Sequence, residues 1–203
     1  MPKAQRSKQQ NMRTRIAAVA ARIMAEDGVE DFATAKRKAA RQLGAVDTQS
    51  LPNNDEIETE LRVYQSLYQG EEQRERLHYL RSQALEAMEQ LVDFKPYLIG
   101  PVLKGTAGRY ADIDLQVFAD SSKELEIFLL NRNIPYETSE LHQYSGDQVR
   151  AVSVLSLDWR GTPVRVAVYG PGDERRNVKT SPLGRPPERA GLEAVRTLVA
   201  RGE

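Results

Sequence analysis

Cysteine is absent from the 203 residues, which excludes disulfide bonds and thiolate metal sites. Histidine is nearly absent too, and neither His78 nor His142 has an acidic or histidine neighbour at metal-ligand spacing. No apolar run approaches the roughly 20 residues that span a bilayer, and the N-terminus lacks the apolar core of a signal peptide. Basic and acidic residues balance at 29 each, so no overall field favours a membrane or nucleic acid. We therefore expect a cytoplasmic protein with no membrane partner.

The first half of the chain has the apolar spacing of helices. A first helix of about fifteen residues is expected to stop at Gly28, and a second, capped by Asp31, to stop at Gly44. Two more amphipathic stripes are separated by Gly70 and predict an antiparallel helix pair. Residues 1–94 are therefore expected to form an α-helical N-terminal region, which is also a surface through which an oligomer can assemble. The stripes are formed by Ile16, Val19, Ala20 and Ile23; Phe32, Ala35, Ala39 and Leu43; Ile57, Leu61, Tyr64 and Tyr68; and Leu77, Leu80, Ala84, Met88 and Leu91.

Charge is unevenly distributed along the helical half. The first 22 residues contain six basic side chains and no acidic one, whereas the region after Gly70 is acidic. Two interpretations fit the basic segment, namely a solvated tail and a surface that binds nucleic acid. A second basic group in the 170–187 loop has the same two interpretations, a solvated loop or a phosphate contact. The basic residues are Lys3, Arg6, Lys8, Arg13, Arg15 and Arg22 in the first segment, and Arg175, Arg176, Lys179 and Arg185 in the loop.

From Pro96 onward the apolar period changes from that of helices to the two-residue period of strands. Residues 95–203 therefore predict an α+β domain, a small mixed β-sheet with packed helices. Trp159 lies beside the Arg160-Gly161 turn and is interpreted as a packing residue, with base stacking as the alternative. The expected strands cover about 97–103, 112–119, 134–141, 149–159 and 163–169, and the expected helices cover 121–133 and 188–201.

Two aspartates, Asp112 and Asp114, stand one residue apart in a strand-like segment. Successive side chains on a strand point to opposite faces, so both carboxylates share one face while Ile113 and Leu115 share the other. Like charges this close need a cation, a proton or a basic partner. A divalent metal such as Mg²⁺ is one interpretation, since it prefers hard oxygen ligands, and a solvated polar strand face is the other.

The segment before this pair contains a glycine-rich basic turn. Gly100, Gly105 and Gly108 permit close approach of the backbone to a ligand, and Lys104 and Arg109 supply positive charge. The order of a short apolar strand ending in Ile99-Gly100, a turn with Lys104-Gly105, and the Asp112-Ile113-Asp114 strand resembles the nucleotidyltransferase superfamily. This superfamily includes polymerase beta, poly(A) polymerases, aminoglycoside nucleotidyltransferases and minimal bacterial nucleotidyltransferases.

The resemblance implies both a fold and a reaction. It implies a nucleotidyltransferase-like sheet and a site that binds ATP or another nucleoside triphosphate with Mg²⁺, in a one- or two-metal arrangement. Asp112 and Asp114 would be the catalytic metal ligands. The reaction would transfer a nucleoside monophosphate to an unidentified acceptor, which is a small molecule, a protein or RNA. The substrate contacts implied are Gly100, Pro101, Lys104, Gly105 and Arg109.

The sequence departs from the family pattern at two positions. Pro101 stands where the family has Gly or Ser, and it has neither a hydroxyl nor an N–H to offer a phosphate. Arg165 stands where the family has a third carboxylate, so the charge is reversed. Asp158 on the preceding strand is a possible substitute, or the partner of Arg165 in an ion pair across the hairpin. These departures leave two alternatives to the enzyme: a catalytically degenerate protein of this fold that binds a nucleotide or another partner, and a nucleic-acid-binding module.

Overall fold

The computed structural model describes residues 3–45, 51–145, 148–175 and 187–202, and they form two compact units. The first unit comprises Met1–Gln73 and Gly105–Ala111, and the second comprises Arg74–Lys104 and Asp112–Glu203. The chain thus leaves the second unit for a short loop and returns to it at Asp112. Among the described residues, no helix is long and apolar enough to cross a membrane.

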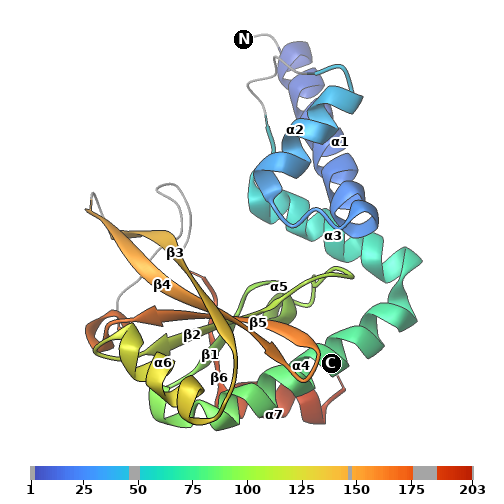
Figure 1. Ribbon diagram of the computed structural model, residues 1–203. Helices are drawn as coiled ribbons and strands as arrows, with labels where there is room; N and C mark the ends of the chain where they lie inside the picture. The colour runs from blue at the N-terminus through green and yellow to red at the C-terminus, as the bar shows by residue number, and fades with distance from the viewer. Residues whose placement is uncertain (1–2, 46–50, 146–147, 176–186, 203) are drawn as a thin grey trace. The chain divides into compact units, whose positions relative to one another are not determined.

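Three helices that lie side by side build the first unit (Figure 1). They are α1 (Lys3–Asp27), α2 (Phe32–Gln42) and α3 (Asn54–Tyr68). Small and branched side chains from all three are fully buried, including Ile16, Ala35 and Ile57. Alanines are frequent in this core, which lets the helix axes approach closely.

Local signals in the sequence set the ends of these helices. Gly28 has a φ of +67°, so it stops α1 in the left-handed conformation that glycine tolerates. The Asp31 carboxylate accepts the N–H groups of Ala33 and Thr34, which confirms the predicted cap of α2. A capping box between Asn53 and Glu56, which was not predicted, starts α3.

The basic N-terminal segment belongs to α1, which is much longer than the predicted fifteen residues. The side chains of residues 1–8 lie outside the described part of the structure. Arg13 donates to both carboxylate oxygens of Glu56 on α3, at 2.8 Å from Nε and 2.7 Å from Nη2. At Arg13, therefore, the segment has a fixed partner and is not the solvated tail that was one of its two interpretations. Arg15 and Arg22 remain exposed.

A six-stranded mixed sheet forms the centre of the second unit, in the order β3-β4-β5-β2-β1-β6. Strands β2 and β5 run parallel, and the other neighbours are antiparallel. This arrangement confirms the predicted α+β class with a small mixed sheet. The strands are β1 (Tyr97–Ile99), β2 (Ile113–Phe118), β3 (Tyr136–Ser145), β4 (Gln148–Trp159), β5 (Thr162–Tyr169) and β6 (Ala190–Gly191).

Helices α4 (Gly70–Gln90) and α6 (Ser122–Asn131) cover one face of this sheet, and α7 (Leu192–Ala200) packs near β1 and β6 (Figure 1). The side chain of Ser121 caps α6 by accepting the Lys123 N–H. The covered face carries Leu115, Leu155 and Val166, which are buried to 1% exposure or less. Two short 3₁₀ turns, at Val92–Phe94 and Pro171–Asp173, complete the described elements. Arg176, Lys179 and Arg185 lie outside the described residues, and Arg175 is exposed.

The predicted antiparallel pair of α3 and α4 was wrong. Helix α3 packs against α1 in the first unit, whereas α4 belongs to the second unit from Arg74 onward. The apolar stripe of α4, including Leu80 and Met88, is buried in the second unit. The apolar side chains of α3 and α4 are therefore buried in two different cores.

The predicted strand 97–103 is also shorter than expected. Strand β1 ends at Ile99, and Gly100–Lys104 form the one-turn helix α5. Gly100 has a φ of +71°, which turns the chain out of the strand, and Pro101 stands in the first turn of the helix, where the fixed φ of proline is favourable.

Candidate functional site

Asp112 and Asp114 lie at the start of β2, on the sheet face that α4 and α6 leave uncovered. Asp112 immediately precedes the strand and Asp114 is its second residue. The intervening Ile113 is fully buried on the opposite face. The side chain of Asp112 is 30% exposed and that of Asp114 is 19% exposed, so both are accessible to solvent where β2 begins. The prediction that the two carboxylates share a face is confirmed, because they contact one common partner.

That common partner is Arg165, which the parallel register of β2 and β5 places beside Asp114. The Nη2 and Nε atoms of Arg165 lie 2.7 Å and 2.9 Å from Oδ1 of Asp114. Its Nε also lies 3.8 Å from Oδ2 of Asp112. The guanidinium therefore supplies the positive charge that two adjacent carboxylates require.

The ionisation of Asp114 reflects two opposing effects. Burial raises the pKa of Asp114 above its ordinary value, because the charged carboxylate loses solvation. The charge and hydrogen bond of Arg165 lower the pKa, and the neighbouring charge of Asp112 raises it. Burial is the larger effect, so the folded protein holds this carboxylate at an energetic cost, as is common in functional sites.

Gly100 packs directly against the carboxylate of Asp114. A Cβ atom at Gly100 would lie 2.7 Å from Asp114 Oδ2, and the positive φ of Gly100 is itself unfavourable for other residues. This glycine was predicted to admit a ligand close to the backbone, and the structure shows that it admits the Asp114 carboxylate. Strand β1 brings the two together, because Ile99 is the register partner of Asp114.

Helix α5 carries Pro101 and Lys104 and is anchored by a buried arginine that the sequence analysis missed. Arg81 of α4 is 6% exposed and donates from Nε to the Val102 carbonyl at 3.1 Å and from Nη2 to the Leu103 carbonyl at 3.0 Å. These bonds satisfy carbonyls at the end of α5, just before Lys104. An arginine in an otherwise apolar stripe is the signal that points to such a role.

Gly105 and Arg109 belong to the loop that is part of the first unit. Gln65 of α3 donates to the Thr106 carbonyl at 3.4 Å, and Gln73 donates to the Ala107 carbonyl at 2.8 Å. Gly105 has a φ of +80°, and Arg109 is exposed beside the ring of Tyr110. These two predicted substrate contacts therefore sit in a different unit from Asp112, Asp114, Gly100, Pro101 and Lys104.

Asp158 has a role in the hairpin turn. Its carboxylate is exposed and accepts the Gly161 N–H at 2.7 Å. The register of β4 and β5 pairs Asp158 with Pro163 and places Ser156 opposite Arg165. The contacts of Asp158 are those of a turn residue, and Arg165 pairs with Asp112 and Asp114.

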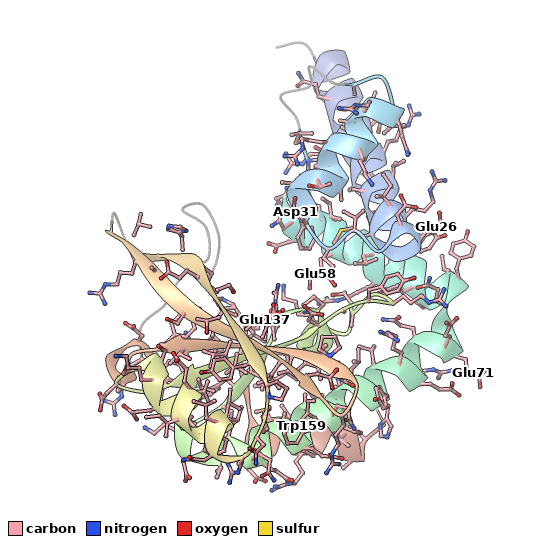
Figure 2. All side chains as sticks on the ribbon, in the orientation of Figure 1. Glu26, Asp31, Glu58, Glu71, Glu137 and Trp159 are labelled. Carbon is pink, nitrogen blue, oxygen red and sulfur yellow. The ribbon has the colours of Figure 1, made fainter. Side chains whose placement is uncertain are left out.

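Two further polar residues share the row of Asp114 and Arg165. In register across the sheet, Arg165 is followed by Ser156 on β4 and then by Glu137 on β3. Glu137 is exposed (Figure 2). Side chains paired in register point to the same face, so the row crosses the open side of the sheet. Local spacing does not encode the order of strands in a sheet, so this row could not be predicted from the sequence.

Mg²⁺ is the metal ion that the family resemblance implies at the carboxylate pair. Asp112 and Asp114 provide hard oxygen donors on one face, and Mg²⁺ is commonly bound by one or two carboxylates plus substrate phosphates. Within the described ranges, no group of three or more His, Cys, Asp or Glu side chains is arranged to hold a metal ion. Asp112 and Asp114 match the one or two carboxylates that Mg²⁺ commonly takes from a protein, with substrate phosphates as further ligands.

Among the comparisons with known proteins, a family model matches part of the chain. Residues 81–170 match a family model described as a nucleotidyltransferase domain. The matched segment begins at Arg81 and runs through α5 and β2 to the end of β5, so it contains Asp112, Asp114 and Arg165. Neither a search of curated proteins nor a search of solved structures gave a significant match.

Proposed function

We propose that this protein binds a nucleoside triphosphate with Mg²⁺ and transfers a nucleoside monophosphate to an acceptor. The proposal is based on the membership of residues 81–170 in the nucleotidyltransferase superfamily. The observation that carries the proposal is the pairing of Asp112 and Asp114 on the open face of β2, beside a glycine that leaves room for the carboxylate. The acceptor is a small molecule, a protein or RNA.

Each residue has a defined part in this proposal. Asp112 and Asp114 hold the metal ion, and a bound Mg²⁺ would neutralise charge on the phosphoryl oxygens. Lys104 at the end of α5 contacts the leaving pyrophosphate, since a lysine acts as a point charge for phosphate. Arg81 fixes the carbonyls that precede Lys104 and is therefore a positioning residue.

Calorimetry tests the binding step. The wild-type protein and the Asp112→Asn/Asp114→Asn double variant are titrated with Mg-ATP, Mg-GTP, Mg-CTP and Mg-UTP. We expect one of these nucleotides to give a binding isotherm that the double variant loses. Asp120→Asn is the matched control, because Asp120 is an exposed acid just after β2. Equal heats of nucleotide binding in the wild type and the double variant would show that Asp112 and Asp114 do not form the binding site.

A second candidate function is nucleotide binding without transfer, and a specific contact favours it. Arg165 holds the carboxylate pair at the position where the resemblance implies a third carboxylate. In two-metal transfer, that carboxylate helps to activate the attacking hydroxyl, so its replacement slows chemistry more than binding. An assay of pyrophosphate release separates the two candidates: turnover that Asp114→Ala abolishes supports the enzyme, and nucleotide binding with no turnover supports the second candidate.

A further inference from the structure

Arg165 is the residue whose contacts the family resemblance does not account for. It neutralises part of the charge of Asp112 and Asp114 without a metal ion, through contacts of 2.7, 2.9 and 3.8 Å. Its side chain is 49% exposed, so the ion pair lies at the protein surface. The contact is therefore strong enough to occupy the pair and exposed enough to be exchanged.

The two oxygens of Asp114 have different surroundings. Oδ2 packs against the backbone of Gly100, whereas Oδ1 accepts a hydrogen bond from Nε of Arg165 and lies 2.7 Å from its Nη2. A metal ion that binds Oδ1 must displace the guanidinium of Arg165. Two cations on the same carboxylate oxygen would repel one another, and partial burial strengthens that repulsion. Arg165 and the metal ion thus compete for the same oxygen.

A nucleotide changes this competition. Phosphate oxygens are favourable partners for a guanidinium, which binds them through two parallel hydrogen bonds. The first turn of α5 carries Pro101, which has no hydroxyl and no N–H for a phosphate. A phosphate placed beside the carboxylate pair would have a donor in Arg165 once the guanidinium leaves Asp114.

We propose that Arg165 is a tethered cation that competes with Mg²⁺ for the Asp112–Asp114 pair and exchanges to a nucleotide phosphate when metal and nucleotide bind together. The inference rests on the proposed function and adds a regulatory property to it. Metal alone binds weakly, and nucleotide and metal strengthen the binding of one another.

Binding of Mn²⁺ tests the competition without any measurement of activity. Free Mn²⁺ is followed by electron paramagnetic resonance, with and without a non-hydrolysable ATP analogue, in the wild type and in Arg165→Gln and Arg165→Met. Without nucleotide, we expect both variants to bind Mn²⁺ about tenfold more tightly than the wild type, or better. With the analogue, the affinity of the wild type should rise more than that of either variant. Arg160→Gln is the matched control, since Arg160 is an exposed arginine that pairs with Glu86 of α4.

The outcomes separate the inference from the function on which it rests. If folded Arg165→Gln and Arg165→Met bind Mn²⁺ no better than the wild type, while all three bind it with nucleotide, the competition is overturned and the proposed function stands. If no protein binds Mn²⁺ under either condition, both fail. If adding Asp114→Asn abolishes the increase in Mn²⁺ affinity of the two Arg165 variants, the increase arises at the Asp114 carboxylate and the inference is supported.

Discussion

Gly100 and Asp114 are in such close contact that a Cβ atom at Gly100 would lie 2.7 Å from Oδ2 of Asp114. The backbone at Gly100 also has a φ of +71°. A side chain at position 100 is therefore unfavourable for two reasons, the strained backbone conformation and the steric clash with the carboxylate of Asp114.

The first prediction is that Gly100→Ala lowers the free energy of unfolding by about 2 kcal/mol or more, since the backbone strain and the clash with Asp114 add. Gly161→Ala is the control for backbone strain alone, because Gly161 has a φ of +84° and a Cβ atom added there would meet nothing within 4 Å. It should cost about 1 kcal/mol. Urea unfolding measures both. Equal losses in the two variants would show that the Asp114 contact contributes nothing.

The second prediction concerns the dependence of stability on pH. The pKa of Asp114 is raised in the folded state, mainly by burial, so the folded protein binds more protons than the unfolded chain above the ordinary aspartate pKa. This carboxylate therefore reduces stability as pH rises through the window from its unfolded to its folded pKa.

Asp114→Asn removes this cost, so we expect its Tm to exceed that of the wild type near neutral pH. The difference should shrink as pH falls below the folded pKa of Asp114, where the wild-type carboxyl is protonated. Thermal unfolding followed by circular dichroism at several pH values measures it, with the exposed Asp120→Asn as control. A Tm for Asp114→Asn below that of the wild type at neutral pH would contradict the prediction.

The third prediction concerns Arg81. Its buried guanidinium satisfies the carbonyls of Val102 and Leu103, so Arg81→Met leaves both without their partners. We expect a loss of about 2–4 kcal/mol in the free energy of unfolding. Lys123→Met on the exposed side of α6 should change it by less than about 0.5 kcal/mol. A loss in Arg81→Met no larger than in Lys123→Met would rule out the anchoring of α5.

The fourth prediction tests whether Arg165 limits catalysis. Arg165→Asp restores a carboxylate beside Asp114 in the parallel register. If the wild type is limited by the missing carboxylate, the variant should release pyrophosphate faster from a bound nucleotide, and adding Asp114→Ala should abolish the gain. An unchanged or lower rate in a folded variant that still binds nucleotide would show that this position does not limit turnover.

Local patterns predicted the parts of the fold that depend on local chemistry. Asp31 caps α2, Gly28 stops α1, and the Arg160-Gly161 turn joins β4 and β5 with positive φ at both residues. The shared face of Asp112 and Asp114 follows from the two-residue period of a strand. Each of these features is set by a few neighbouring residues.

Features that depend on packing between distant segments were not predictable in the same way. The apolar stripes of α3 and α4 look alike in sequence, yet they are buried in different units, because an amphipathic stripe does not specify its partner. Arg165 was identified as a charge reversal, but its contacts with both aspartates required the parallel pairing of β2 and β5. The loop containing Gly105 and Arg109 was predicted as part of the site, and its place in the first unit depends on Gln65 and Gln73, which are far from it in sequence.

The most direct test of the central claim is calorimetric titration of the protein with Mg-nucleotides, comparing wild type, Asp112→Asn/Asp114→Asn and Asp120→Asn. We expect the wild type and Asp120→Asn to bind the same nucleotide with equal affinity and the double variant to lose this binding. Equal binding by all three proteins would contradict it.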